Sequence, residues 1–423
     1  MECNFQIFLD GEWVHCATLS LRQDAGGSFF EYDLDYAFSG GQDAVSLQFP
    51  VNAELRTLPN LPPFFYDLIP QGSGRKFLLG MLKLLDGPLA DFPLVMAGAF
   101  NPIGRVRVAE AVAYFDQHVL RHKDLRGHHG LTLEQITSRG EEFHEQMMIH
   151  SMLAAGTTGV QGAAPKYLLT KDRQGAWHAD GALTDEQAAA HFIVKRPRGN
   201  TAQDQKVLKN ERAYMEVAGL MGLRTHGLLE QIGDSLFIPR FDRVANQGTV
   251  IRHHQESAAS LAGLIGFDTR PSQFDILAAI RSHVTDKPGE TIEFLKRDVL
   301  NLAMRNTDNH ARNTAVQKIG AEIRLTPLFD FAPMYLDPEG IARAARWYHP
   351  VSQKELPTWT EVLQTLNVSE PERTRITEEM HTFGTRLQEL EHYMRQAGVD
   401  DDVIDFLLPS VDEQSRQLLS LGK

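Results

Sequence analysis

Cysteine is scarce in this sequence, and so are long apolar runs and any excess of positive charge. Only Cys3 and Cys16 occur in 423 residues, so we expect neither a disulfide framework nor a cysteine zinc site, and a reducing compartment fits best. No stretch approaches the roughly 20 apolar residues that span a bilayer. The first residues also lack the charged start and apolar run of a signal peptide. We therefore expect a cytoplasmic protein without a membrane segment.

The charge balance is acidic, with a formal net charge of −13. Strong direct binding to nucleic acid is therefore not expected, because Lys and Arg contacts to phosphate dominate such binding. Apolar residues make up 42% of the chain and charged residues 23%, which is enough apolar material for packed cores and argues against disorder. The length predicts two or three packed units.

Short β-rich runs separated by turns fill the first part of the chain. Strands are predicted over 4–21 on both sides of the Asp10-Gly11 turn, over 43–52, and as a pair around Asn101-Pro102 within 92–111. The segment 61–85 is expected to end as an amphipathic helix, and 116–150 to be helical or a linker. Strands are expected again over 165–171, 191–197 and 234–242.

Helical spacing begins within this strand-rich part and dominates after about residue 251. In 210–222, Tyr214, Val217, Ala218 and Met221 share one helix face, and Gly222 is a natural C-cap. A strand-rich part followed by a helical part is an α+β pattern. We divide it into the segments 1–115, 116–250 and 251–423.

The strongest chemical signal is "NTDNHARNTAV", residues 306–316, followed by "LTPLFDFAPM", residues 325–334. Asp308 and Asn313 are five residues apart, like the base and the metal-binding amide of a kinase catalytic loop, H-R-D-x-x-x-x-N. Asp330 follows 17 residues later, before Phe-Ala, as a metal-binding Asp does in D-F-G. Phosphoryl transfer needs one carboxylate for the hydroxyl, and an amide with a carboxylate for magnesium. The alternative is that these residues only form turns and helix caps.

A second group of residues upstream suits a nucleotide. Lys195 ends the apolar strand "HFIVK", like the lysine of V-A-I-K that pairs with phosphates, and Glu211 at the start of the next helix could pair with it. The small residues of 154–166 permit the close backbone approach that a phosphate-binding loop requires. The alternatives are that Lys195 is an ordinary solvated lysine at the end of a strand and that 154–166 forms a plain turn.

Residues 236–243, "LFIPRFDR", end a strand between these two groups, where a kinase hinge would meet adenine. Pro239 could offer only its carbonyl, since it has no N–H, whereas the Phe241 N–H could donate. The alternative is a strand with an Arg-Asp pair on the surface.

These motifs together resemble the HipA family of toxin kinases over nearly the whole chain. "LPPFFYDLIPQGSGR", "GVQGAAPK", "HFIVK", "NERAYMEVAGLMGL", "PRFDR", "HQES", "NTDNHARN" and "LTPLFDFA" follow one another in family order. The form "NTDNHARNTAV" is most similar to the stand-alone branch of enterobacterial HipH and YjjJ, although the N-terminal helix-turn-helix associated with that branch is not evident.

The resemblance implies a two-lobed, protein-kinase-like fold with an N-terminal β-rich subdomain, a nucleotide-binding lobe and an all-helical C-terminal lobe with the catalytic loop. It implies ATP, Mg²⁺ and transfer of the γ-phosphate to serine or threonine of a protein, causing growth arrest or persistence. Asp308 would accept the proton, and Asn313 and Asp330 would bind magnesium and the nucleotide. The other nucleotide-binding residues it implies are Gln161, Gly162, Ala163, Ala164, Pro165, Lys166, Lys195, Pro239, Phe241 and His310.

Family members typically pair with a HipB-type antitoxin that binds DNA, and glutamyl-tRNA synthetase is the best-known target. The resemblance therefore implies such an antitoxin and a protein substrate, an aminoacyl-tRNA synthetase being one example. One departure concerns regulation: Gly159 stands where the family carries an autophosphorylated serine, with Thr157 and Thr158 beside it. Two alternatives stay open, a catalytically silent binding or regulatory module and a kinase acting on a small molecule.

Overall fold

The computed structural model describes residues 1–22, 27–39, 43–121, 130–139, 143, 165–246 and 248–422. The chain divides into two compact units that interleave along the sequence. The first comprises Met1–Arg198, Ile232–Glu256 and Gly263–Phe267, and the second comprises Gly199–Gln231, Ser257–Ala262 and Asp268–Lys423. Within the described ranges, no helix is long and apolar enough to cross a membrane. The division of the sequence into the segments 1–115, 116–250 and 251–423 stays a prediction.

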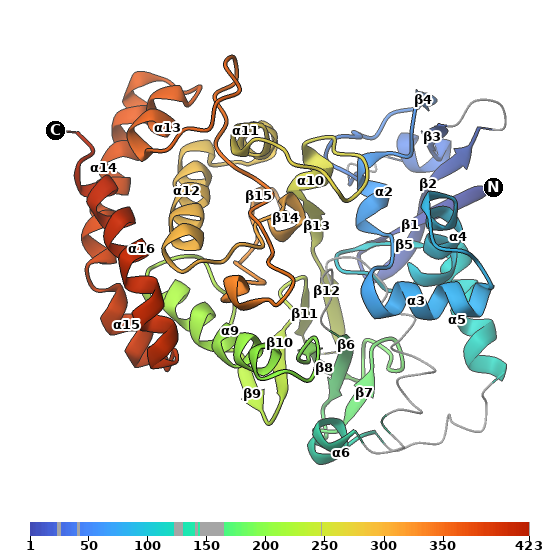
Figure 1. Ribbon diagram of the computed structural model, residues 1–423. Coiled ribbons are helices and arrows are strands. Elements are labelled where there is room, and N and C mark those ends of the chain that lie inside the picture. The colour runs from blue at the N-terminus through green and yellow to red at the C-terminus, as the bar shows by residue number, and fades with distance from the viewer. Residues whose placement is uncertain are drawn as a thin grey trace. The chain divides into compact units, whose positions relative to one another are not determined.

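The first unit begins with a five-stranded sheet in the order β4-β3-β2-β1-β5 (Figure 1). Its strands are β1 (Glu2–Leu9), β2 (Glu12–Leu21), β3 (Ser28–Tyr32), β4 (Arg56–Leu58) and β5 (Val106–Val108). Asp10 and Gly11 close the β1–β2 hairpin with φ values of 47° and 91°, the positive values that a two-residue type I′ turn needs. The hairpin predicted over 4–21 is thus confirmed.

Helices pack with this sheet around an aromatic core. They are α1 (Leu34–Phe38), α2 (Pro63–Asp67), α3 (Gly72–Leu82), α4 (Pro88–Gly98) and α5 (Ala109–Arg121). The helix α6 (Leu133–Ser138) instead contributes Ile136 to a separate buried cluster with Leu169 and Trp177. Phe5, Phe30 and Phe49 all meet the ring of Phe64 edge-on, with centroids 5.4–5.6 Å apart, an arrangement that aromatic quadrupoles favour. The helix expected at the end of 61–85 is confirmed as α3.

Two strand predictions in this unit are wrong. Residues 43–52 form turns and bends, because the Leu47 N–H and the Ser46 hydroxyl donate to the buried Glu256 carboxylate at 2.8 and 2.6 Å instead of joining a sheet. Residues 88–98 form α4, and of the pair expected within 92–111 only β5 exists. A continuous apolar run does not by its periodicity distinguish a buried strand from a buried helix.

The second sheet of the chain has the order β7-β6-β8-β10-β9. Its strands are β6 (Lys166–Asp172), β7 (Trp177–Ala179), β8 (Ala188–Lys195), β9 (Glu230–Ile232) and β10 (Ser235–Pro239), and they are followed by β11 (Arg243–Asn246), β12 (Thr249–Arg252) and β13 (His254–Ser257). Leu169, Trp177, Val194 and Phe237 form a buried cluster with this sheet. The strands predicted over 165–171, 191–197 and 234–242 are confirmed.

The second unit is mainly helical (Figure 1). Its elements are α9 (Ala202–Leu220), α10 (Ala258–Leu261), α11 (Gln273–His283), α12 (Lys287–Ala303), η3 (Ala311–Asn313), β14 (Ala315–Ile319), β15 (Glu322–Leu325), η4 (Met334–Leu336), α13 (Trp359–Thr365), α14 (Glu370–Leu387), α15 (Leu390–Ala397) and α16 (Asp401–Leu419). Thr201 and Asp286 cap α9 and α12 with side-chain acceptors, as helix N-termini require. Tyr214, Val217, Ala218 and Met221 are buried, so the predicted helix face is confirmed. The α+β class, strand-rich first and helical later, is confirmed. The C-terminal part is not all-helical as expected, because β14 and β15 pair as an antiparallel hairpin within it.

Candidate active site

A short hairpin in the second unit brings the two halves of the predicted catalytic set together. Asp308 lies in the loop that follows α12, and Asn313 ends η3 just before β14. Strands β14 and β15 pair antiparallel with Val316 opposite Leu325, so the chain after β15 returns beside the chain before β14. The Thr326 N–H donates to the Ala315 carbonyl at 2.9 Å. The hairpin thereby places Asn313 and Asp330, which are 17 residues apart in sequence, at the same end.

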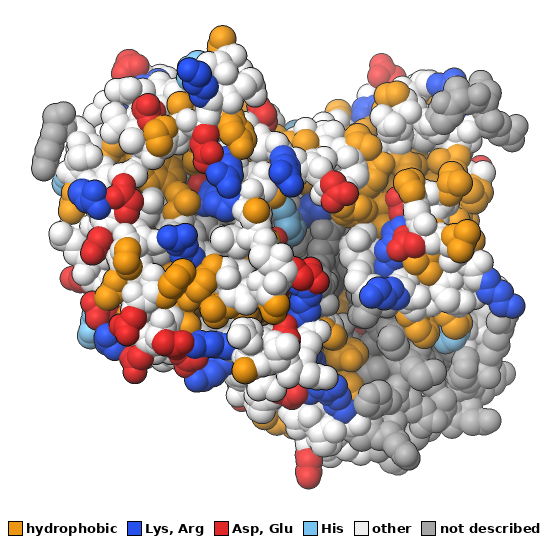
Figure 2. All heavy atoms as spheres, viewed as in Figure 1, with side chains coloured by type: hydrophobic (Ala, Val, Ile, Leu, Met, Phe, Trp, Pro, Cys, Tyr) orange, Lys and Arg blue, Asp and Glu red, His pale blue; other side chains and the backbone are white. Residues whose placement is uncertain are grey.

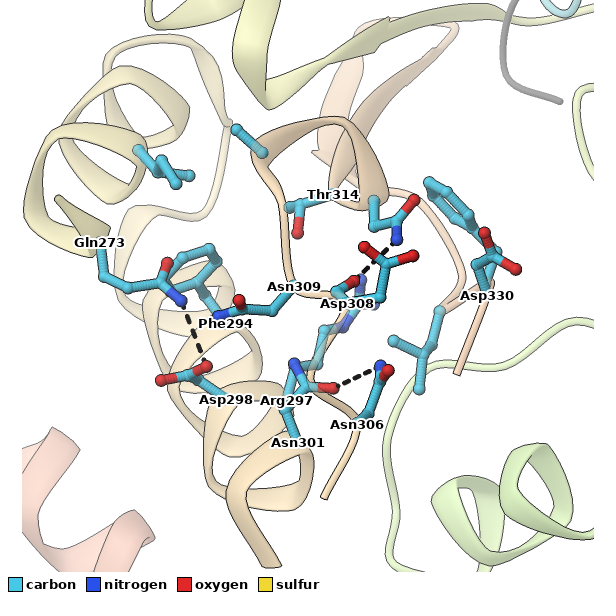
Figure 3. A pocket seen from close by; sticks show the side chains of 15 residues that line it. Gln273, Phe294, Arg297, Asp298, Asn301, Asn306, Asp308, Asn309, Thr314 and Asp330 are labelled. Carbon is cyan, nitrogen blue, oxygen red and sulfur yellow. Dashed lines mark hydrogen bonds between the residues drawn. The ribbon is translucent and has the colours of Figure 1, made fainter. Parts of the chain in front are cut away.

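Asp308, Asn313 and Asp330 line one small pocket of about 30 Å³ (Figure 3). Such a volume holds one or two water molecules, which suits the surroundings of a metal ion and is too small for a nucleotide. In Figure 3 the carboxylates of Asp308 and Asp330 lie on one side of the pocket, and Asp298 and Gln273 lie on the opposite side. The prediction that these three residues share a site is therefore consistent with their placement, while their roles stay a prediction.

Hydrogen bonds within the loop order its polar side chains. The Asn313 Nδ2 donates to the Asp308 carbonyl at 2.8 Å. This bond uses the amide nitrogen of Asn313 and fixes the orientation of its side chain, whose oxygen is an acceptor. His310 Nε2 lies 3.6 Å from Asp308 Oδ1, and the Asp308 side chain is 23% exposed. A carboxylate with this exposure can meet a substrate hydroxyl.

Asp330 adopts a left-handed backbone conformation, with φ of 55°. Asp and Asn tolerate this region better than most residues, although it is sparsely populated. Phe331 follows it, is buried, and packs on the buried ring of Tyr214 from α9 at a centroid distance of 5.3 Å. Outliers of this kind are typical of functional turns that their surroundings hold in place.

Buried charges of α12 hold the end of the hairpin. Glu290 accepts from the Leu325 N–H at 2.9 Å and forms an ion pair with Arg224 at 2.7 Å. Arg297 donates to the Thr326 carbonyl at 2.7 Å and pairs with Glu293. Burial lowers the pKa of Arg297, while Glu293 counteracts this. These contacts fix the start of the segment that leads to Asp330.

Two residues of this region were missed by the sequence reasoning. Asn309, next to Asp308, donates to the Ala345 carbonyl at 2.8 Å and accepts from the Ala344 N–H at 3.1 Å. Asp298 accepts from Trp347 Nε1 and from Arg343, both at 2.8 Å. Both clamp residues 343–347 beside the catalytic loop. A buried Asn in a polar loop looks like its exposed neighbours in sequence, so no signal singled it out.

The first unit contains the predicted phosphate lysines. Lys195 ends β8 and Lys166 begins β6, and the two residues are direct partners in the antiparallel pair. Both are buried, with 7% and 8% exposure. Directly opposed residues project from the same face of a sheet, and like charges there are unfavourable without compensation. Pro165 is described just before β6, whereas Gln161, Gly162, Ala163 and Ala164 lie outside the described residues, as do Thr157, Thr158 and Gly159.

The predicted hinge segment adjoins a set of buried charges. Pro239 ends β10 opposite Phe192 and Phe241 is partly buried, so both stay candidates for adenine contacts. We call Asp180, Arg240, Asp242 and Arg243 the buried ionic cluster. The alternative of a surface Arg-Asp pair is wrong, because the side chains of Arg240 and Asp242 are 0% and 2% exposed.

Ion pairs and hydrogen bonds connect all four members of the buried ionic cluster. Arg240 binds both oxygens of Asp242 at 2.9 and 2.6 Å and reaches Asp180 at 2.9 Å. Arg243 binds Asp180 at 3.2 Å and the Asn101 side chain at 2.6 Å. Although burial raises the pKa of Asp242, Arg240 outweighs it and lowers that pKa to about 2. The cluster therefore ties the strands around β10 to residues 101–104 as ionised groups.

The donor types in the second unit fit magnesium. Carboxylate and amide oxygens from Asp308, Asn313 and Asp330 are the hard ligands that Mg²⁺ prefers, and it commonly takes only one or two protein ligands besides phosphate and water. Across the described ranges, no group of three or more His, Cys, Asp or Glu side chains is arranged to hold a metal ion. Glu211 is buried at the middle of α9 (Ala202–Leu220) and not at the start of the helix as expected, because the helix begins at Ala202 behind its Thr201 cap.

Comparisons with known proteins agree on one class, proteins built from a HipA N-terminal domain and a HipA-like C-terminal domain. The HipA N-terminal domain matches residues 6–109, and the HipA-like C-terminal domain matches residues 158–387. Because the second match alone covers more than half of the chain, the chain belongs to the HipA family. A comparison with curated proteins finds no match.

One solved structure supports the same fold. HipA from the Shewanella oneidensis MR-1 complex of HipA, HipB and operator DNA superposes with a TM-score of 0.65 over 98% of this chain and 96% of that one, at 16% identity. This superposition confirms the expected HipA-like fold. The Helicobacter pylori proinflammatory kinase CtkA matches 54% of this chain and 87% of its own, with a TM-score of 0.37 and 14% identity.

Proposed function

We propose that this chain is an ATP-dependent kinase that phosphorylates serine or threonine in a protein and acts as a toxin. The observation that carries the proposal is the placement of Asp308, Asn313 and Asp330 around one pocket at the end of the β14–β15 hairpin. Those residue types, at the spacing of a kinase catalytic loop and metal-binding turn, serve phosphoryl transfer.

Each of the three residues has a proposed role. Asp308 orients the substrate hydroxyl and accepts its proton, which suits a carboxylate that is 23% exposed. Asn313 and Asp330 would hold magnesium, which when bound neutralises charge on the phosphates. The clamps at Asn309 and Asp298 keep residues 343–347 close to the loop, where they can shape the approach of a protein segment.

The nucleotide is proposed to rely on residues of the first unit as well. Lys195 is proposed to hold the phosphates and Lys166 to belong to the nucleotide loop, and the two residues lie directly opposite each other on β8 and β6. Residues Gln161 to Ala164 are proposed to supply backbone N–H groups, and His310 a further contact. The Pro239 carbonyl and the Phe241 N–H are proposed to meet adenine.

A HipB-like antitoxin is the proposed protein partner. The similar Shewanella protein occurs in a complex with HipB and operator DNA, and the net charge of −13 here favours a partner that makes the DNA contacts. The protein substrate is proposed to be a translation enzyme such as an aminoacyl-tRNA synthetase, following the family resemblance.

Phosphoproteomics tests the kinase proposal directly. Wild type and Asp308→Asn are each induced in a bacterial host, and phosphopeptides that rise only with wild type are identified. New phosphoserine or phosphothreonine sites together with growth arrest support the proposal. Growth arrest that is equal in both strains, with no new site, supports the silent binding module instead. Purified wild type that consumes ATP only with a metabolite extract would point to a small-molecule kinase.

A further inference from the structure

The C-terminal helix α16 makes contacts to both chain segments that flank the candidate active site. Phe406, on its second turn, stacks on Tyr335 with ring centroids 4.4 Å apart and planes 13° from parallel. Tyr335 lies five residues after Asp330, in η4. Stacked aromatic pairs attract each other beyond the effect of their buried area.

The same part of α16 also holds the start of the catalytic loop. The guanidinium of Arg305 lies over the Phe406 ring at 5.8 Å, and Arg305 Nε donates to Ser410 Oγ at 2.7 Å. Arg305 has a φ of 53° and directly precedes the loop that contains Asp308. This positive φ belongs to the C-terminal cap of α12, in which the Asn306 N–H donates to the Asn301 carbonyl at 2.9 Å. The Arg305 side chain connects this cap to α16.

A second route runs from the beginning of α16 through α9. Asp400, the N-cap residue of α16, accepts from Asn210 Nδ2 and donates its own N–H to Asn210 Oδ1, both at 3.0 Å. One turn further along α9, Tyr214 donates to the Met304 carbonyl at 3.1 Å and packs on Phe331. Asn210 and Tyr214 lie on the same side of the helix, because they are four residues apart. Phe406 therefore contacts the segments on both sides of the site directly, through Arg305 and Tyr335. Asp400 is connected to the same two segments through α9, where Tyr214 contacts Met304 and Phe331.

Exposed charges on this surface are paired with opposite charges. Figure 2 shows Lys or Arg and Asp or Glu side chains interleaved over part of the helical unit. Lys209 pairs with Asp400 at 2.5 Å, and Lys206 pairs with Asp402. Exposed pairs of this kind contribute little, so the buried Asn210 contact and the Phe406 stack carry the connection.

From these contacts we infer that α16 is a positioning element of the phosphoryl-transfer site, with Phe406 and Asp400 as its positioning residues. Neither residue lines the pocket. They act by holding Arg305, Tyr335 and, through α9, Phe331. The inference rests on the proposed kinase function, since its purpose is to keep Asp308 and Asp330 in place.

The key variant is Phe406→Ala. Phe406 is 50% exposed, so its truncation should leave the core and the melting temperature nearly unchanged. We expect a kcat about tenfold lower and a higher Mg²⁺ concentration for half-maximal rate, because small misplacements of reacting groups are costly. The KM for ATP should change less than kcat. Phe406→Tyr keeps the ring and should restore the rate, and Asp405→Ala on the exposed neighbour should behave like wild type.

Hydrogen exchange supplies a readout that does not depend on activity. Amides of 304–310 and 329–336 should exchange faster in Phe406→Ala than in Asp405→Ala, and Phe406→Leu serves in the same way if the alanine variant does not fold. Equal exchange in both, or a folded Phe406→Ala with wild-type kcat and Mg²⁺ dependence, overturns the inference. If wild type transfers no phosphate, the proposed function fails, and the exchange comparison still decides whether α16 holds these segments.

Discussion

Two charged motifs of this chain look alike in sequence, yet the structure uses them in different ways. "PRFDR", residues 239–243, places Arg240, Asp242 and Arg243 in the buried ionic cluster, where each side chain is at most 2% exposed. "TDNHARN", residues 307–313, leaves the Asp308 side chain 23% exposed beside a pocket. The charges of the first motif pair with one another and with Asp180, whereas the second motif has a partly exposed carboxylate beside a pocket.

We expect this difference to distinguish a structural motif from the proposed catalytic one. A buried ion pair is costly to break, because the remaining partner stays charged without compensation. A catalytic carboxylate instead contributes little to folding and much to the transition state. Variants in the two motifs should therefore affect opposite properties, stability in the first unit and turnover in the second.

The largest expected effect comes from Asp308→Asn. The substitution keeps the shape of the side chain and removes the proton acceptor, so phosphoryl transfer should fall by about 10²–10⁴-fold. ATP affinity by calorimetry and the melting temperature should stay close to wild type. Wild-type turnover in this variant would remove Asp308 from the mechanism, and a large loss of stability would place it with the structural charges.

Asp180→Ala should show the opposite pattern. It leaves Arg240 and Arg243 facing each other with only Asp242 to compensate, and breaking such a buried network costs about 3–5 kcal/mol. Urea unfolding measures the loss. Glu391→Ala is the control, since it breaks an ion pair with Arg395 in which both side chains are nearly half exposed, and about 0.5 kcal/mol is expected there. Equal losses in both variants would contradict the structural role of the cluster.

Acid titration should separate the two motifs further. Arg240 and Arg243 help lower the pKa of Asp242 to about 2, below the roughly 3.9 of an unfolded Asp. Because the folded pKa is the lower one, this group stabilises the protein above pH 4, and the contribution of about 2.5 kcal/mol is lost as pH falls toward 2. Unfolding free energies measured from pH 5 to pH 2.5 should fall less steeply in Asp242→Asn than in wild type. If the unfolding free energy falls equally steeply with pH in both proteins, the low pKa of Asp242 does not contribute to stability as expected.

The sequence predicted local features well where turn chemistry or periodicity was distinctive. The Asp10-Gly11 hairpin, the α9 face at Tyr214 and the spacing of Asp308, Asn313 and Asp330 all depend on short-range patterns, and the structure agrees with each placement. The hairpin β14–β15 was not predicted, although it explains why Asp330 lies near Asn313.

Long-range contacts account for what sequence reasoning missed. Residues 43–52 have the composition of a strand, but Glu256, more than 200 residues away, takes their donors. Arg240 and Asp242 look like exposed charges until Asp180 and residues 101–104 bury them. Asn309 acts through backbone groups of Ala344 and Ala345, which no spacing rule connects. These partners become visible only when the chain has folded.

The smallest expected effect, and the sharpest test of the second motif, is Asp330→Asn. Asp330 has a φ of 55°, so alanine would add backbone strain, whereas Asn tolerates this conformation and removes only the charge. If Asp330 is a magnesium ligand, Mg-ATP affinity should fall at least about tenfold, since even indirect partners of a metal ligand cost that much. ATP affinity measured with a chelator should be the same as in wild type, because the lost interaction needs the metal. Calorimetry under both conditions distinguishes the two roles. If Asp330 is a magnesium ligand, the variant loses affinity only when magnesium is present. If Asp330 is only a turn residue, the affinity of the variant is unchanged under both conditions.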